Sequence, residues 1–156
     1  MRSASLAVKR GFDLLFSLGL LVLLGPALLL VALAIRLTSP GPILFRHERL
    51  GRSGKPFACY KFRTMVQGAG ALTRRDADGA TIVPADDPRV TPLGRVLRQW
   101  SVDELPQLWN VLRGEMSVVG PRPDEVLALP LYTERQRHKL AMRPGLTGLA
   151  TVNGRN

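Results

Sequence analysis

A run of 22 residues without a charged side chain lies between Asp13 and Arg36. Its sequence is LLFSLGLLVLLGPALLLVALAI. As a helix it would be about 33 Å long, which matches the hydrocarbon core of a lipid bilayer. This feature predicts a membrane-embedded segment, so we expect the chain to be bound to a lipid bilayer.

A secretory signal peptide is the alternative interpretation of this run. Lys9 and Arg10 resemble its basic leading region, and Ala32-Leu33-Ala34 resembles a cleavage site. The apolar run is longer than that of a typical signal, and five Lys and Arg residues follow within positions 36–55. These bases resist translocation and favour the membrane segment.

The charges around the run constrain its topology. Bases precede it at Arg2, Lys9 and Arg10, and a stronger basic cluster follows it, so the positive-inside rule favours the cytoplasmic side for both ends. Pro26 lies near the middle, where it removes a helical hydrogen bond. A re-entrant hairpin broken at Pro26 satisfies both observations, whereas a spanning helix with a proline kink is the ordinary alternative. The residues alone leave the two open.

Composition limits the rest of the chain. Its 156 residues allow one modest domain, and 22 Lys and Arg against 12 Asp and Glu give a net charge of +10. An anionic partner is expected, which charge alone does not identify. The single cysteine, Cys59, excludes a disulfide framework and fits a reducing location.

Turn residues and periodicity divide the soluble part into short elements. Residues 43–50 and 55–65 predict a β-hairpin around the turn at 51–54. Residues 67–89 predict a loop with at most one helical turn. Thr91 and Pro92 begin a helix whose apolar stripe suits a membrane interface. A second helix ends at Gly114, and a buried strand over 116–120, a helix over 131–141 and a brief strand near the end follow.

These elements predict an α+β protein of two parts. Residues 1–38 form a membrane-embedded helical hairpin, and residues 39–156 form a small cytosolic, membrane-associated α+β catalytic domain with interfacial helices.

Asp103 and Glu104 are the first candidates for chemistry. Because Pro106 is tolerated only in the first turn of a helix, Asp103 is expected near the N-cap. Its carboxylate would lie at the positive helix end, where phosphates also bind. Adjacent residues there diverge, so one can attack phosphorus while the other holds a metal. A capping Asp followed by a first-turn Glu is the structural alternative.

Bases on turns and strands are the second set of candidates. Two prolines fix the backbone around Arg122, which suits a phosphate clamp, although any rigid turn looks similar. Lys61 and Arg63 alternate on one predicted strand and could approach a phosphate together. The remaining substrate-binding candidates are Arg98 and, on turns, Arg143 and Asn153-Gly154-Arg155-Asn156. Cys59 is interpreted as a packing residue.

Six blocks in order carry a family resemblance. They are KRGFDLL, the Pro-broken apolar run, SPGPILFRHERLGRSGKPFACYKFRTM, DDPRVTPLGRVLR, SVDELPQLWNVLRGEMSVVGPRP and RPGLTGLATVNGRN. With them the chain resembles the bacterial sugar transferases, the monotopic polyprenyl-phosphate phosphoglycosyl transferases. The resemblance implies a re-entrant helix broken at Pro26, at the cytoplasmic face of the bacterial inner membrane.

The resemblance also implies a reaction. Asp103 would attack a phosphate of a UDP-sugar, release UMP and form a phosphoglycosyl-aspartyl enzyme, which a polyprenyl (undecaprenyl) phosphate then attacks. Glu104 would coordinate Mg²⁺, and Arg122 would bind nucleotide or phosphate. Family members usually continue for some tens of residues past the NGRN stretch, so a C-terminal truncation is expected.

Two other function classes were weighed. A catalytically silent membrane protein that keeps lipid or partner binding remains the alternative, and homo-oligomerisation stays open. A nucleic-acid binder would explain the charge of +10, but aromatic residues make up only 6% of the chain and the Pro-broken segment would have no purpose. We therefore expect no nucleic-acid partner.

Overall fold

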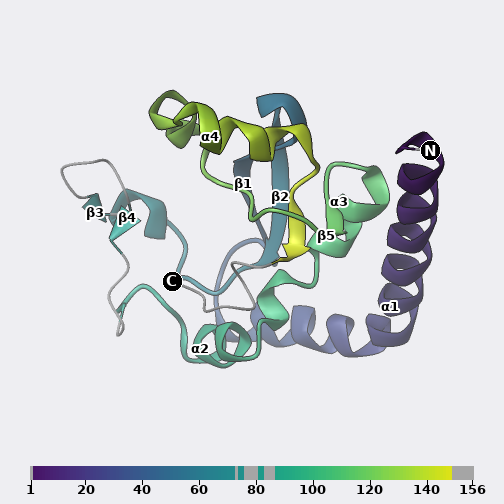
Figure 1. Ribbon diagram of the computed structural model, residues 1–156. Helices are drawn as coiled ribbons and strands as arrows, with labels where there is room; N and C mark the ends of the chain where they lie inside the picture. Colours follow the sequence, from purple (N-terminus) through teal and green to yellow (C-terminus); the bar gives the residue numbers. More distant parts are fainter. Residues whose placement is uncertain (1, 73, 76–80, 83–86, 149–156) are drawn as a thin grey trace.

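The structure is a computed structural model that describes residues 2–72, 74–75, 81–82 and 87–148. It is a mixed helix and sheet protein in which one long helix flanks a set of short elements (Figure 1). The elements in chain order are α1 (Arg2–Thr38), β1 (Leu44–Leu50), η1 (Arg52–Gly54), β2 (Pro56–Phe62), η2 (Ala69–Leu72), β3 (Arg74–Arg75), β4 (Thr81–Ile82), α2 (Pro92–Gln99), η3 (Val102–Glu104), α3 (Gln107–Arg113), β5 (Ser117–Val119), η4 (Val126–Leu131), α4 (Glu134–Arg137), η5 (His138–Ala141) and β6 (Gly145–Thr147).

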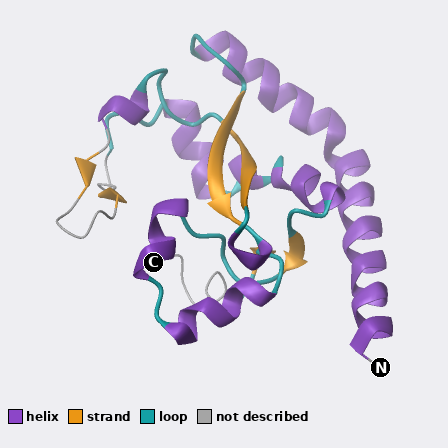
Figure 2. Cartoon of the chain, turned by 90° about the horizontal axis from the view of Figure 1, so that it is seen from above, coloured by secondary structure: helices purple, strands orange, loops and turns teal. Residues whose placement is uncertain are grey.

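Helix α1 is long, apolar and largely uncovered by protein. It is the one helix of the described residues that is long and apolar enough to cross a membrane. It contains Pro26 and changes direction in its middle part, and it lies along the outside of the other elements in both views (Figures 1 and 2). Many of its large side chains are exposed, Leu15 and Leu23 by about three quarters. In a core helix of a soluble protein, neighbouring elements would cover such side chains.

The first third of α1 is joined to the domain by polar contacts. Asp13 is 2% exposed and accepts hydrogen bonds from Ser117 Oγ at 2.8 Å and from the Val118 backbone N–H at 3.1 Å. Lys9 forms an ion pair with Asp13 at 3.2 Å and also contacts Ser117. Arg10 donates to the Val111 carbonyl at 2.7 Å, near the end of α3. The start of α1 is therefore fixed to β5 and α3.

The end of α1 packs on the same domain. Ile35 forms a buried cluster with Phe62 at the end of β2 and with Leu97 of α2. Just after the helix, the Arg63 guanidinium donates to the Ser39 carbonyl and hydroxyl oxygens, both at 2.8 Å. Both ends of α1 thus contact one domain, which a straight helix could not achieve.

The predicted hairpin is confirmed and is the largest sheet of the described residues. β1 and β2 pair antiparallel from Leu44 opposite Phe62 to Leu50 opposite Pro56. Helix α3 is attached to β2 by Asn110, whose side-chain oxygen accepts from the Tyr60 N–H at 3.1 Å and whose amide donates to the Ala58 carbonyl at 2.7 Å. One buried side chain therefore supplies the partners that a third strand would otherwise provide.

The local signals for the helices are also confirmed. The Thr91 side chain caps α2 by accepting from the Gly94 N–H at 2.9 Å, and Pro92 is the first helical residue. The expected stripe is divided, because Leu97 is buried while Trp100 is 73% exposed. Gly114 ends α3 in the left-handed conformation at φ 83°.

The strands predicted over 116–120 and near the end of the chain are confirmed as β5 and β6, whereas their parallel pairing was not predicted. β5 pairs with β6, Ser117 opposite Gly145 and Val119 opposite Thr147. The predicted helix over 131–141 is two short turns, α4 and η5, with a capping box at Thr133. Within 67–89, the described residues contain η2 and the β3–β4 pair.

Cys59 is a packing residue, as predicted. It is 2% exposed and forms a cluster with Val111, Met116 and Val118, with Phe57 packed against it. Burial raises the pKa of the Cys59 thiol to about 11, against the nearby Lys61 charge that lowers it. The thiol is therefore protonated at neutral pH.

Replacing Asp13 by Ala should destabilise the protein, because it leaves the buried Val118 N–H without its acceptor and removes the carboxylate partner of the Ser117 hydroxyl and of Lys9. We expect a loss of about 2 kcal/mol or more, seen as a melting temperature several degrees lower in detergent. Glu48→Ala, at an exposed position of β1, is the matched control. An Asp13→Ala variant that melts with this control would contradict the anchoring role.

Cys59 should react very slowly with a maleimide. At pH 7.5 a pKa of about 11 leaves roughly one thiolate in three thousand molecules. An exposed cysteine made by Ser53→Cys in a Cys59→Ala background should label over 100-fold faster, and both proteins should label fully in detergent that unfolds them. Equal native rates would show that Cys59 is accessible.

Candidate active site

Residues from separate parts of the chain line one open pocket. Three of them are predicted site residues: Lys61 from β2, Glu104 from η3 and Arg122 from the loop after β5. The other lining residues are Arg49, Cys59, Gln107, Pro123, Gly145 and Leu146. Three cationic side chains therefore surround one carboxylate, which favours an anionic ligand.

Lys61 and Glu104 form the polar centre of this pocket. Lys61 Nζ lies 2.8 Å from Glu104 Oε1, and the two side chains are 26% and 19% exposed. The ion pair is half-buried, so its charges are less screened than those of a surface pair. It joins β2 to the turn that also carries Asp103.

Asp103 lies on the same turn but not at the predicted helix position. It belongs to the one-turn helix η3, and the N-cap residue of α3 is Pro106, so the expectation that Asp103 lies near that N-cap is wrong in detail. The chain enters η3 through Ser101, which has the left-handed conformation at φ 59°. Asp103 is 7% exposed, whereas Glu104 lines the pocket. A buried and a half-buried carboxylate are thus adjacent.

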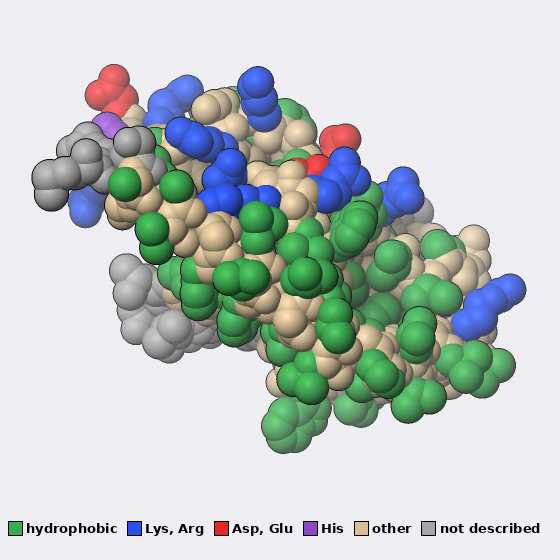
Figure 3. Space-filling model, turned by 90° about the vertical axis from the view of Figure 1, so that its right-hand side faces the viewer, with side chains coloured by type: hydrophobic (Ala, Val, Ile, Leu, Met, Phe, Trp, Pro, Cys, Tyr) green, Lys and Arg blue, Asp and Glu red, His purple; other side chains and the backbone are tan. Residues whose placement is uncertain are grey.

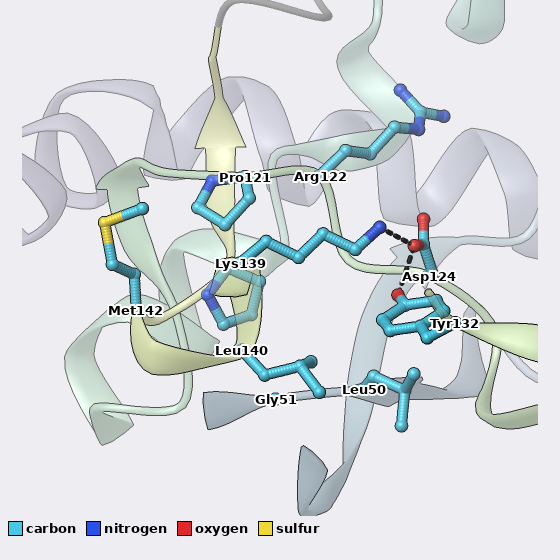
Figure 4. Close-up of a pocket in the computed structure, with 10 residues that line it drawn as sticks. Leu50, Gly51, Pro121, Arg122, Asp124, Tyr132, Lys139, Leu140 and Met142 are labelled. Carbon is cyan, nitrogen blue, oxygen red and sulfur yellow. Dashed lines mark hydrogen bonds and ion pairs between the residues drawn. The ribbon is translucent and has the colours of Figure 1, made fainter. Parts of the chain in front are cut away.

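Arg122 is exposed on the loop between β5 and η4. Within the described residues its guanidinium has no ion-pair partner, and Figure 4 shows it extending away from Asp124. The guanidinium of Arg49, on β1, has its Nη2 atom 3.9 Å from Oε1 of Glu125. Among the described residues, Arg122 is therefore the one of the three cations around the pocket that forms no ion pair with a carboxylate.

The other predicted substrate-binding residues have protein partners outside the pocket lining. Arg98 Nε donates to Thr64 Oγ1 at 2.8 Å. Arg143 Nε donates to the Gly114 carbonyl at 2.8 Å. Arg63 is 7% exposed and contacts the end of α1, so it does not share the surroundings of Lys61. The Asn153-Gly154-Arg155-Asn156 stretch lies outside the described residues.

The acidic side chains of the site determine whether it could hold a metal ion. The described part of the chain has no group of three or more His, Cys, Asp and Glu side chains arranged to hold one. Mg²⁺ in phosphoryl-transfer sites typically uses only one or two carboxylates together with substrate phosphates. Glu104 is a single carboxylate that lines the pocket, so it fits Mg²⁺ held jointly with substrate phosphates.

Sequence reasoning missed two groups of residues. Asp13 was noted only as the boundary of the apolar run and within the KRGFDLL block, because nothing local indicates a partner at Ser117. Asp124, Tyr132 and Lys139 form a second polar cluster beside Arg122. The position of Asp124 two residues after Arg122 was the one available signal for it.

A family model and several individual proteins are similar to this chain over most of its length. The family model described as bacterial sugar transferase matches residues 4–156. The uncharacterized sugar transferase EpsL of Bacillus subtilis is 45% identical over 149 residues, which cover 96% of this chain and 70% of that protein. The exopolysaccharide production protein PSS of Rhizobium leguminosarum is 47% identical, covering 96% of this chain and 75% of its own length.

A third relative carries a reaction in its name. The UDP-glucose:undecaprenyl-phosphate glucose-1-phosphate transferase of Caulobacter vibrioides is 48% identical, over 94% of this chain and 54% of its own length. The matched region includes the turn with Asp103 and the loop with Arg122. The match extends over nearly the whole chain, and the chain belongs to the bacterial sugar transferase family.

Proposed function

We propose that the protein transfers a sugar 1-phosphate from a UDP-sugar to a polyprenyl phosphate and releases UMP, as the first membrane step of surface polysaccharide or glycoconjugate synthesis. The observation that carries this proposal is the pocket in which Lys61, Arg49 and Arg122 surround Glu104, next to buried Asp103. The names of relatives, including undecaprenyl-phosphate galactose and glucose phosphotransferases, support the donor and acceptor classes.

The proposed reaction has two displacements. A carboxylate oxygen of Asp103 attacks the sugar-bearing phosphorus, and the bond from that phosphorus to the oxygen bridging the two phosphates breaks, so that UMP leaves. The acceptor phosphate then attacks the same phosphorus and displaces Asp103, which gives a polyprenyl diphosphate sugar. A covalent intermediate divides the meeting of a soluble donor and a lipid acceptor into two steps.

The cations of the pocket support the first displacement. Phosphate oxygens repel an attacking carboxylate, and Lys61, Arg49 and Arg122 oppose that repulsion. Glu104 would hold Mg²⁺, which when bound supplies further positive charge to the phosphates. The Lys61 ion pair keeps the Glu104 carboxylate directed toward the pocket.

For α1 we propose a re-entrant membrane helix with both ends at the cytoplasmic face. Its beginning contacts β5 and its end contacts β2 and α2, so both ends meet the same domain. In Figure 3 hydrophobic side chains cover the lower part of one face and most Lys and Arg side chains gather above them. Such a boundary suits a domain resting on anionic lipid, with residues 1–38 in the membrane and exposed Trp100 at its surface.

Cysteine labelling tests this topology. In a Cys59→Ala background, Ser5→Cys before the apolar run and Ser53→Cys in the domain should both be protected from an impermeant maleimide in intact cells. Both should label after the inner membrane is opened, because both lie on the cytoplasmic side. Labelling of the Ser5→Cys protein in intact cells, with the Ser53→Cys protein protected, would establish a spanning helix instead.

Substitutions at the carboxylate pair test the mechanism. Asp103→Asn should abolish both UMP release and labelling of the protein by a donor labelled in its sugar, because the amide is no nucleophile. Glu104→Gln should retain slow labelling that rises with added Mg²⁺, since the Asp103 carboxylate remains. UDP-glucose, UDP-galactose and UDP-N-acetylglucosamine are screened with polyprenyl phosphate in detergent.

The same assay separates the competing interpretations. An Asp103→Asn protein that keeps most of the wild-type activity would make Asp103 a structural residue and exclude the covalent mechanism. A folded wild-type chain that releases no UMP from any donor would favour the catalytically silent membrane protein. Glu134→Gln, an exposed change on α4, serves as the matched control for removal of one acidic charge.

A further inference from the structure

A second, shallow pocket lies beside the candidate active site (Figure 4). It is formed by the end of β1, the loop that follows β5 and the α4–η5 segment. Arg122 lines both pockets, and the neighbouring residues Pro144 and Gly145 each line one of them. The two pockets are therefore adjacent parts of one depression. A ligand whose phosphates lie in the first could extend into the second.

Three polar side chains meet in this second pocket. The Tyr132 hydroxyl and Lys139 Nζ both donate to the same oxygen of Asp124, Oδ2. The ammonium group of Lys139 also lies over the Tyr132 ring, 4.5 Å from its centre. The side chains of Lys139 and Asp124 are 31% and 32% exposed, so a ligand in the pocket can reach them.

The cluster keeps unused hydrogen-bonding capacity. Within the described residues, Asp124 Oδ1 accepts no hydrogen bond, and an ammonium group has three N–H donors. Burial alone would raise the pKa of Asp124, but hydrogen bonds from Lys139 and Tyr132 outweigh it and hold this pKa below its usual value. Burial would lower the pKa of Lys139, but its bond to Asp124 acts against burial and this pKa is raised. The cluster therefore presents an acceptor and a donor side by side at neutral pH.

This chemistry differs from that of the first pocket. Asp124 and Lys139 together carry no net charge, and the carboxylate would repel a phosphate. Two neighbouring hydroxyls suit the cluster instead, because one can donate to Oδ1 while the other accepts from Nζ. Leu140, Met142 and Pro121 supply apolar surface around the polar group, as the C–H bonds of a sugar ring require.

We propose that this pocket binds a vicinal diol of the donor while Arg122 holds its phosphate in the adjoining pocket. The inference rests on the proposed function. The diol belongs either to the transferred pyranose or to the ribose of the nucleotide, and the two have the same hydrogen-bonding chemistry. Lys139 and Asp124 are in both cases the residues that recognise it.

Binding measurements on the detergent-solubilised full chain test the subsite without requiring turnover. UMP, UDP-glucose and UDP-galactose are titrated by calorimetry into the wild-type protein, Lys139→Met and the matched control Arg137→Met, which removes an exposed base from the same segment. Loss of a hydrogen bond to a charged group should weaken binding of the UDP-sugars by about tenfold or more in Lys139→Met alone.

Donor analogues locate the contact. Of two donors that each lack one hydroxyl of the diol, the one without the hydroxyl bound by Lys139 should bind the wild-type protein about tenfold more weakly, yet lose little further in Lys139→Met, because both changes remove the same contact. If only the UDP-sugars are affected, the diol is that of the pyranose, whereas equal weakening of UMP assigns the ribose. Should Lys139→Met fail to fold, Lys139→Gln, which keeps one donor group, replaces it in the same cycle.

Two results would overturn the subsite. Unchanged affinity of Lys139→Met for all ligands, or independent effects of the analogue and the substitution, would make the cluster a structural link between η5 and the Arg122 loop while leaving the proposed function intact. A folded wild-type protein that binds none of UMP, UDP-glucose and UDP-galactose would instead overturn the proposed function together with the subsite.

Discussion

The buried carboxylate of Asp13 is the contact on which the placement of α1 depends. It accepts hydrogen bonds from the Ser117 hydroxyl and the Val118 N–H, so the first third of an apolar helix is joined to β5 by polar contacts. Polar bonds have directions, which general apolar packing does not, and they fix the helix in one orientation. Because β5 leads into the loop of Arg122, the contact that fixes α1 also supports one wall of the candidate active site.

A domain with such small sheets needs other means of holding its elements together. The three sheets of the described residues have two strands each, and side chains replace the missing ladders. Asn110 bonds the backbone of β2 on both sides of Cys59, and Arg10 bonds the last carbonyls of α3. Since α3 follows the Asp103 turn, these bonds hold that turn against the strand that carries Lys61, and the Lys61–Glu104 pair forms at the junction.

Features set by neighbouring residues could be predicted from the sequence. The hairpin turn at 51–54, the Thr91 cap and the helix end at Gly114 were predicted because local sterics and local hydrogen bonds decide them. Contacts between distant residues could not be derived in this way. Asp13 and Ser117 are 104 positions apart. Lys61 and Arg63 alternate on one predicted strand, and the sequence does not show that Lys61 pairs with Glu104 in the pocket while Arg63 is buried against Ser39. The expectation that Asp103 lies near the N-cap of α3 was wrong for a similar reason, because no distinct sequence signal marks a separate helical turn before Pro106.

The distribution of charge around the site suits a reaction between a soluble and a lipid substrate. Cations gather at the first pocket, where Arg49, Lys61 and Arg122 surround one carboxylate, whereas the second pocket is balanced by Asp124 and Lys139. A phosphate is therefore favoured in the first and a hydroxyl-bearing group in the second. Arg122 borders both, so a ligand with both groups would be oriented by electrostatics before any close packing forms. In the proposed reaction such orientation would matter beside a membrane, because a lipid acceptor would move within one plane and the donor would have to present one face of its phosphorus to that plane.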